Sequence, residues 1–174
     1  KLTFAEIDSL ASRAECGCGG AFYLPYLSGT GTPYLVDKAL GGFVGLSGFT
    51  NQAHLTRAVM EGVAFGIRQC LEVVNGSHKK ILVTGGITRS SLWTQILADV
   101  LGQPLQLRQV KDASGIGAVI LAAKAIGAID DVVSLAQLLG GTTSTKEPCP
   151  ENVEIYEDNF KNFVRWSEVF VQSE

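Results

Sequence analysis

The stretch between residues 81 and 101 most constrains what this chain can fold into, because it reads as a strand that turns directly into a helix. A short apolar run, Ile81 to Val83, predicts the strand, and the glycine pair Gly85 and Gly86 follows it. The next segment has Ser90 or Ser91 as a helix N-cap. Its apolar residues recur at helical spacing: Leu92, Trp93, Ile96, Leu97, Val100 and Leu101.

A turn of this kind is suited to binding a polar or anionic ligand. A strand that turns tightly into a helix presents backbone N–H groups and the positive end of the helix dipole. Gly85 and Gly86 permit positive φ angles and remove the Cβ atoms that would hold a ligand away from the backbone. The alternative, an ordinary strand–helix turn without a ligand, stays open because two glycines alone are a weak signal.

The composition excludes several classes of protein. Of the 174 residues, 46% are hydrophobic and 18% are charged, which predicts a globular chain and not a disordered one. The net charge of −3 argues against nucleic-acid and membrane-surface binding, and no apolar run approaches the roughly 18 residues of a membrane span. The mixed, acidic N-terminal segment does not read as a signal peptide, and its first residue, which is not Met, indicates a fragment or a processed product.

The four cysteines, Cys149 among them, predict free thiols. Cys16 and Cys18 are separated by one residue, which is not a convincing metal spacing, and neither His54 nor His78 has ligand-like neighbours. A third cysteine, Cys70, lies on the apolar face of a predicted helix and reads as a small core residue. We therefore expect neither zinc nor disulfides, and a reducing, cytoplasmic location.

The remaining segments predict short strands first and then strands that alternate with helices. Helices are expected over residues 3–13, 52–74, 118–126, 130–139 and 152–171, with Thr50 and Asp130 as the N-caps of the second and fourth. Strands are expected over residues 21–24, 42–46 and 104–108, and a loop over residues 140–145. This order predicts an α/β layer fold with a mixed sheet.

The long helix over residues 52–74 carries two more specific predictions. Gly62 and Gly66 lie four residues apart on one face, which predicts that another backbone packs closely against it. Arg57 and Glu61 are also four residues apart, and we expect them to form an ion pair on the solvent side.

Four motifs together resemble the C-terminal domain of the FGGY family of carbohydrate kinases. One is Gly-Gly-Phe-Val-Gly-Leu at residues 41–46, followed after seven residues by His-Leu-Thr-Arg-Ala-Val-Met-Glu at residues 54–61. A second is the Leu-Pro-Tyr-Leu-Ser-Gly loop at residues 24–29 with Thr-Pro-Tyr at residues 32–34. The third is the glycine pair with the helix at residues 93–102, and the fourth is the glycine–alanine helix at residues 117–123. The resemblance spans about residues 22–127.

The resemblance implies an actin-like ATPase fold of the ribonuclease H type, in which ATP with Mg²⁺ lies between two domains and a sugar hydroxyl receives the γ-phosphoryl group. Residues 1–174 would be one domain, on the nucleotide side. Gly86 and Ser90 match the family's nucleotide-contacting glycine and the polar residue four positions later. Gly85 and Ile87 flank that contact, so these four residues form the predicted ATP or ADP site.

The resemblance also implies that much of the kinase is missing from this chain. The family's catalytic base, its first phosphate loop and nearly all its sugar contacts lie in the N-terminal domain or just after it, and none of those motifs occurs here. We therefore expect no catalytic and no metal-binding residue in these 174 residues, and no turnover by them alone. Uncovered apolar surface, including Tyr26 and Tyr34, predicts a possible homo-oligomer.

Two departures from the family pattern bear on specificity. Ile87 replaces a small residue after the glycine pair and would narrow the adenine pocket. Thr30 and Gly31 stand where xylulose-type and gluconate-type kinases carry glutamate and arginine. The loop and helix motifs favour a xylulose-like ketopentose as substrate, while Gly31 keeps glycerol as the alternative.

The sequence also has features of two other classes of protein. A short-chain dehydrogenase would explain the glycine turn, and Tyr34 and Lys38 have the spacing of that family's catalytic pair. However, the third glycine of its cofactor turn is missing, and this pair precedes the turn and lies in a proline- and glycine-rich loop. A non-catalytic actin-like module that binds a nucleotide or a partner stays open, whereas the lack of a Gly-Lys-Ser/Thr loop excludes a P-loop NTPase.

Overall fold

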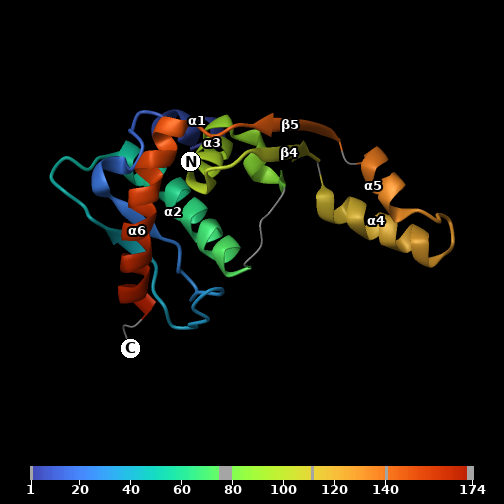
Figure 1. The fold of residues 1–174 in the computed structure, drawn as a ribbon, viewed down its shortest axis with the longest axis horizontal. Coiled ribbons are helices and arrows are strands. Elements are labelled where there is room, and N and C mark those ends of the chain that lie inside the picture. The colour runs from blue at the N-terminus through green and yellow to red at the C-terminus, as the bar shows by residue number, and fades with distance from the viewer. Residues whose placement is uncertain (1, 75–79, 111, 140, 172–174) are drawn as a thin grey trace.

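The computed structural model describes residues 2–74, 80–110, 112–139 and 141–171. The elements are, in chain order, α1 (Phe4–Ala11), η1 (Cys18–Gly20), β1 (Phe22–Leu24), β2 (Gly42–Val44), α2 (Gln52–Val73), β3 (Ile81–Thr84), η2 (Gly86–Arg89), α3 (Ser91–Leu101), β4 (Leu105–Gln109), α4 (Ala113–Ala125), α5 (Val132–Leu139), β5 (Thr142–Lys146) and α6 (Pro150–Val171) (Figure 1). Here η1 and η2 are short 3₁₀ helices.

The described strands form two small sheets. In the three-stranded sheet, β4 lies between β3 and β5, parallel to β3 and antiparallel to β5. The strands β1 and β2 form an antiparallel pair against α2 and α6. The predicted α/β fold with a mixed sheet flanked by helices is therefore confirmed.

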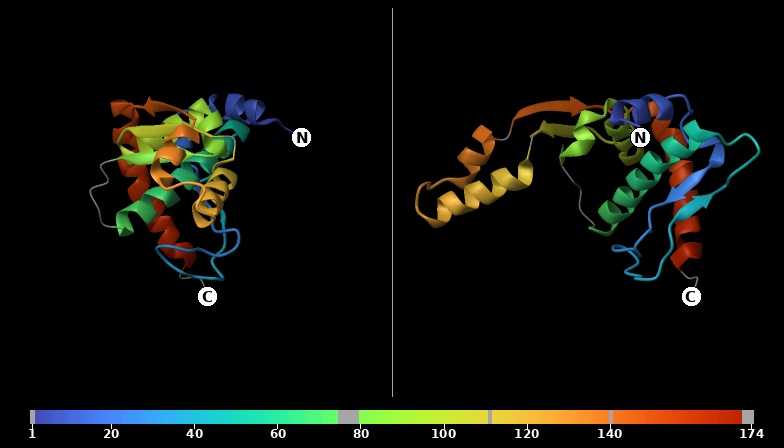
Figure 2. Two further views of the ribbon diagram at one scale, coloured as in Figure 1. Left: turned by 90° about the vertical axis from the view of Figure 1, so that its right-hand side faces the viewer. Right: turned by 180° about the vertical axis from the view of Figure 1, so that it is seen from behind.

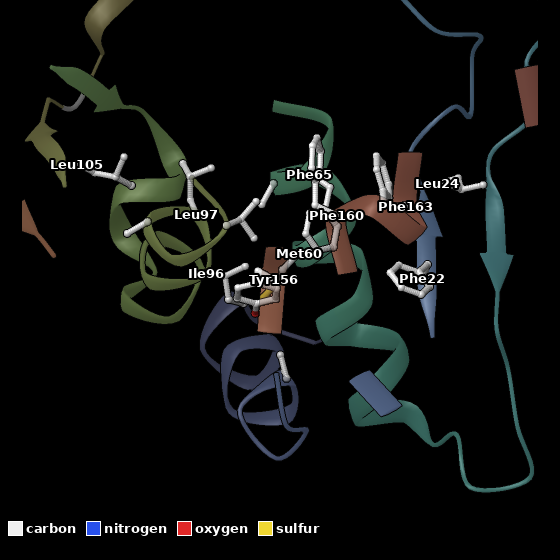
Figure 3. Close-up of a cluster of buried hydrophobic side chains, with 14 of the residues drawn as sticks. Phe22, Leu24, Met60, Phe65, Ile96, Leu97, Leu105, Tyr156, Phe160 and Phe163 are labelled. Carbon is white, nitrogen blue, oxygen red and sulfur yellow. The ribbon is translucent and has the colours of Figure 1, made fainter. Parts of the chain in front are cut away.

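The main hydrophobic core lies between α2, α3, α6 and the inner faces of both sheets (Figure 3). Phe65 of α2 contacts three aromatic rings of α6 at centroid distances of 5.2–6.1 Å: Tyr156, Phe160 and Phe163. Side chains along a strand alternate between the two faces of a sheet, so every second residue of β4 faces the core. Leu105 and Leu107 are two such residues, and both are buried. The long helices are amphipathic, and their apolar stripes meet at this core.

A cluster of buried polar groups joins α2 and α6 to the loop after α1. The Arg57 Nε atom donates to Glu61 Oε1 at 2.7 Å, and its other nitrogens donate to Ala14 O and to the Tyr156 hydroxyl. That hydroxyl donates in turn to Glu61 Oε1 at 2.7 Å. The predicted Arg57–Glu61 pair therefore forms, but its expected place on the solvent side is wrong: both side chains are buried because α6 and the loop cover them.

Close backbone packing occurs at one of the two helical glycines. A Cβ atom on Gly62 would lie 2.1 Å from the carbonyl oxygen of Tyr23, so only glycine lets β1 approach α2 this closely. A Cβ atom on Gly66 would make an ordinary 3.8 Å contact with Pro25. The prediction of a close backbone thus holds for Gly62 and not for Gly66.

Several predicted boundaries and environments differ from the structure. Asn51, and not Thr50, caps α2, and Asp131, and not Asp130, accepts hydrogen bonds from the first backbone amides of α5. The helix α4 begins five residues before its predicted start, capped by Asp112, whose carboxylate accepts from the Gly115 amide.

Two further expectations, a loop and an exposed tyrosine, are also corrected. Strand β5 (Thr142–Lys146) occupies most of the predicted loop over residues 140–145, so that prediction is wrong; Gly140 lies outside the described residues. Tyr26 is buried in the core and its hydroxyl donates to Ser167, so the expectation that it is exposed is wrong, whereas Tyr34 is half-buried.

The helices α4 and α5 form an arm that stands away from the body of the molecule in Figure 1 and in the right-hand view of Figure 2. The arm is inserted between β4 and β5, which are neighbours in the sheet. The helix α4 is apolar on nearly every side, yet only Ile120 is buried, while Val119 and Leu121 are 61% and 67% exposed. Helices of this composition are usually covered on all sides, so the exposed surface of the arm is unusual.

We predict that Glu61→Ala lowers the free energy of unfolding by about 3–5 kcal/mol, because it leaves the buried Arg57 charge without a carboxylate partner. Urea unfolding followed by circular dichroism measures the change. The matched control is Glu72→Ala on the same helix. Glu72 is an exposed partner of Arg68, with 3.3 Å between Arg68 Nε and Glu72 Oε1, so its removal should lower the free energy of unfolding by less than about 1 kcal/mol. Equal losses in the two variants would contradict the prediction.

Candidate nucleotide-binding site

The turn between β3 and α3 is built around one glycine with an unusual backbone conformation. Gly85 has φ +91° and ψ −160°, a region that residues with a Cβ atom rarely adopt. The buried Thr88 side chain donates to the Gly85 carbonyl at 2.8 Å, and the Thr88 amide donates to the same oxygen at 3.2 Å. These two bonds fix the carbonyl and close the 3₁₀ turn η2.

Ser90 ends this turn and begins the helix. Its backbone is extended, and its Oγ atom accepts a hydrogen bond from the Trp93 amide at 2.9 Å, which makes it the N-cap of α3. The prediction that Ser90 or Ser91 caps this helix is confirmed, with Ser90 as the residue. The hydroxyl hydrogen of Ser90 is still available to donate to a ligand.

Gly86 provides space beside the turn. A Cβ atom built on it would meet no heavy atom within 4 Å, and the same is true of Gly85. Gly86 does not have a positive φ angle, so of the glycine pair only Gly85 uses that freedom. The absence of a side chain at residue 86 is therefore not required by the protein's own packing, and the space it leaves suits an approaching ligand.

Ile87 points the other way. It is half-buried and packs against the main hydrophobic core, where it anchors the turn. The structure thus brings the four predicted residues together in one short segment, with Gly85 and Gly86 on its exposed side, Ile87 against the core and Ser90 at the helix start.

Two buried nitrogen atoms near this turn have no hydrogen-bond partner among the described residues: Trp93 Nε1 and Arg108 Nε. Trp93 lies in the first turn of α3, and Arg108 lies on β4 directly opposite Thr84, the residue before Gly85. Both atoms are donors, so a ligand that satisfied either would have to supply an acceptor. The sequence predicts Arg108 as a strand residue and not as a site residue, because its place beside the glycine turn depends on the pairing of β3 with β4.

No comparable site is found around the cysteines and histidines. Within the described ranges, no group of three or more His, Cys, Asp or Glu side chains is arranged to hold a metal ion, and all four cysteines are free thiols; His78 lies outside these ranges. Burial raises the pKa of Cys16 to about 11, and burial together with the Glu61 carboxylate raises the pKa of Cys18. Cys70 is half-buried and donates to the Thr32 carbonyl at 3.3 Å, so it is not the core residue expected.

Comparison with known proteins decides the family. The model of the FGGY family of carbohydrate kinases, C-terminal domain, matches residues 3–126. The chain belongs to this family. Its four motifs and its glycine turn are therefore features of an FGGY domain, and the short-chain dehydrogenase reading is excluded.

The relatives of the FGGY domain by sequence include xylulose kinases and glycerol kinases. It is 29% identical over 161 residues to a xylulose kinase of Staphylococcus epidermidis, covering 91% of this chain and 32% of the relative. It is 35% identical over 137 residues to a glycerol kinase of Clavibacter michiganensis, covering 76% of this chain and 27% of the relative. The FGGY domain thus spans about a third of the length of these relatives.

Solved structures show the same fold. The xylulose kinase of Rhodospirillum rubrum superimposes with a TM-score of 0.79 at 32% identity, over 95% of this chain and 33% of that one. The glycerol kinase of Plasmodium falciparum, solved with ADP, superimposes with a TM-score of 0.78 at 18% identity, over 99% of this chain and 35% of that one, and so supports the fold alone. The FGGY domain has the actin-like ATPase fold of these kinases.

We predict that the two glycines differ in their effect on folding. Gly85→Ala should lower the free energy of unfolding by about 1–3 kcal/mol, because alanine is strained at φ +91°. Gly86→Ala should leave stability almost unchanged, because its Cβ atom would meet open space without a positive φ angle. Urea unfolding of the two variants side by side tests this, and a destabilised Gly86→Ala would mean that residue 86 is needed for folding.

Proposed function

We propose that the FGGY domain is the nucleotide-binding part of an ATP-dependent carbohydrate kinase, in which it holds the adenosine half of ATP or ADP at Gly85, Gly86, Ile87 and Ser90. The observation that carries this proposal is the open space beside Gly86 on a turn whose backbone is fixed by Thr88 and Ser90. Membership of the FGGY family supplies the reaction class, which is transfer of the γ-phosphoryl group of ATP to a sugar or polyol hydroxyl.

The residues of the turn fit a nucleoside. A ribose or base edge can approach the backbone at Gly86 without meeting a side chain, and the Ser90 hydroxyl can donate while it still accepts from the Trp93 amide. Bound ATP supplies the phosphoryl group. The residues of this chain would bind and orient the nucleoside, which is a positioning role.

The rest of the reaction belongs to parts of the kinase that lie outside residues 1–174. Among the described residues, no group of three or more His, Cys, Asp or Glu side chains is arranged to hold a metal ion such as the Mg²⁺ that accompanies ATP. We propose that residues 1–174 form one domain on the nucleotide side, and that the metal, the catalytic base and the sugar are bound elsewhere in the kinase. A cytoplasmic location goes with this proposal, and none of the described helices is long and apolar enough to span a membrane.

The substrate we propose is xylulose or a similar pentulose. Xylulose kinases are present both among the relatives by sequence and among the solved structures of this fold. Glycerol is the second candidate, because the relative from Clavibacter michiganensis is a glycerol kinase with 35% identity. Self-association stays a proposal as well. The exposed Val119 and Leu121 of α4, and Ile126 at its C-cap, are surface that would favour it.

For activity, we expect the intact kinase to release ADP in a sugar-dependent, saturable manner, with xylulose turned over better than glycerol. The 174-residue chain alone should show no turnover, because we propose that the base for the acceptor hydroxyl lies elsewhere in the kinase. A coupled ADP-release assay with a panel of pentuloses and polyols measures both. An intact protein that binds ATP but phosphorylates no member of the panel would favour the non-catalytic nucleotide-binding module.

For the nucleotide, we expect Gly86→Val to abolish ATP binding to the intact kinase while the protein stays folded, because the valine side chain would occupy the space of the ligand. Ser90→Ala should weaken binding by about 0.5–1.5 kcal/mol, the contribution of one hydrogen bond. Isothermal titration calorimetry measures the affinities. Gly48→Val is the matched control. A Cβ atom on Gly48 also meets nothing within 4 Å, but Gly48 precedes α2 and is not part of the glycine turn.

Two outcomes of this titration would redirect the proposal. Equal ATP affinities in folded wild type and Gly86→Val would mean that the turn is scaffold and the nucleotide binds elsewhere. Tighter ATP binding in Ile87→Gly would mean that the Ile87 side chain narrows the pocket, despite its packing against the core.

A further inference from the structure

Arg108 lies beside the glycine turn without being part of it. It is paired in register with Thr84 on the parallel strand β3, and the next residue of that strand is Gly85. Adjacent strands of a sheet are about 4.8 Å apart, so the Arg108 backbone lies next to the start of the turn. The 3₁₀ helix η2, which begins at Gly86, also contacts β4.

The side chain of Arg108 stands on the face of the sheet that points away from the core. Leu105 and Leu107 of the same strand are buried in the core, and alternation puts Arg108 on the opposite face. The residues paired with it on both sides are uncharged: Thr84 on β3 and Thr143 on β5. A cation thus sits on the central strand between two threonines.

This cation has no partner within the part of the chain that the structure describes. Its Nε atom is buried and makes no hydrogen bond, and no carboxylate forms an ion pair with its guanidinium. Two other arginines with little exposure, Arg57 and Arg68, are both paired with glutamates. The acidic residue nearest to Arg108 in sequence, Asp112, uses its carboxylate to cap α4. A buried donor left unsatisfied is costly and calls for an acceptor other than the described residues.

We propose that Arg108 is a binding residue of the nucleotide site and that its guanidinium donates to a phosphate group of the bound nucleotide. This inference rests on the proposed binding of the nucleotide at the glycine turn. A phosphate supplies both the acceptor that Nε lacks and the negative charge that the guanidinium lacks. Arg108 thereby adds a charged contact to a site whose other four members are uncharged.

The test compares ligands with and without phosphate. Adenosine and ADP are titrated by calorimetry into the intact kinase and its variants Arg108→Gln and Arg108→Lys. Arg108→Gln should weaken ADP binding at least about tenfold and leave adenosine binding unchanged, because a charge-assisted contact to phosphate is lost. Arg108→Lys, which keeps the charge without the planar fork, should give a smaller loss for ADP. Arg165→Gln, an exposed arginine on α6, is the matched control and should change neither affinity.

Each outcome decides the inference. An unchanged ADP affinity in Arg108→Gln, or an equal loss for adenosine and ADP, overturns the assignment of Arg108 to phosphate. If Arg108→Gln does not fold, judged by circular dichroism, Arg108→Lys carries the test, and an unchanged ADP affinity in that variant overturns it. The Gly86→Val variant separates a failure of this inference from a failure of the proposed nucleotide site. Normal ADP binding by Gly86→Val would refute the nucleotide site at the glycine turn. Loss of ADP binding in Gly86→Val, together with normal ADP binding in Arg108→Gln, would refute only the role of Arg108.

Discussion

The buried group of Arg57, Glu61 and Tyr156 is the interaction on which the rest of the fold depends. It joins α2, α6 and the loop after α1 at a point where all three are shielded from water. A buried charge pair is stable only when its remaining donors and acceptors are satisfied, and here the Ala14 carbonyl and the Tyr156 hydroxyl satisfy them. Because these partners come from distant parts of the chain, the group also fixes how α6 and the loop after α1 pack against α2.

The same packing gives the glycine turn a rigid base. Asp99, buried near the end of α3, accepts hydrogen bonds from the Cys149 amide and the Asn152 side chain at 2.7 and 2.8 Å, so it holds the start of α6 against α3. Ile87 at one end of the turn packs on the core, and Ser90 at the other caps the helix. A ligand at Gly86 would therefore meet a backbone already held in place, which lowers the entropy that binding must overcome.

The sequence predicted the elements whose signals are local. The glycine pair and the Ser90 cap follow from neighbouring residues, and so does the long helix α2. It could not predict β5, since Thr142 to Lys146 lacks apolar alternation and is a strand only because β4 offers it hydrogen-bonding partners. It placed Arg57 and Glu61 correctly as a pair but on the wrong side, because burial comes from α6, a hundred residues later in the chain. Arg108 was missed because its unpaired state is a property of the folded sheet.

The insertion of α4 and α5 between two neighbouring strands makes the arm an independent appendage. The two ends of the arm leave the sheet side by side, at Gln109 and Thr142, which are paired in register. Continuity of the sheet consequently does not depend on how long the arm is or what it carries. Related chains could lengthen, shorten or recompose this appendage while the glycine turn stays the same, so it is a natural place for members of the family to diverge.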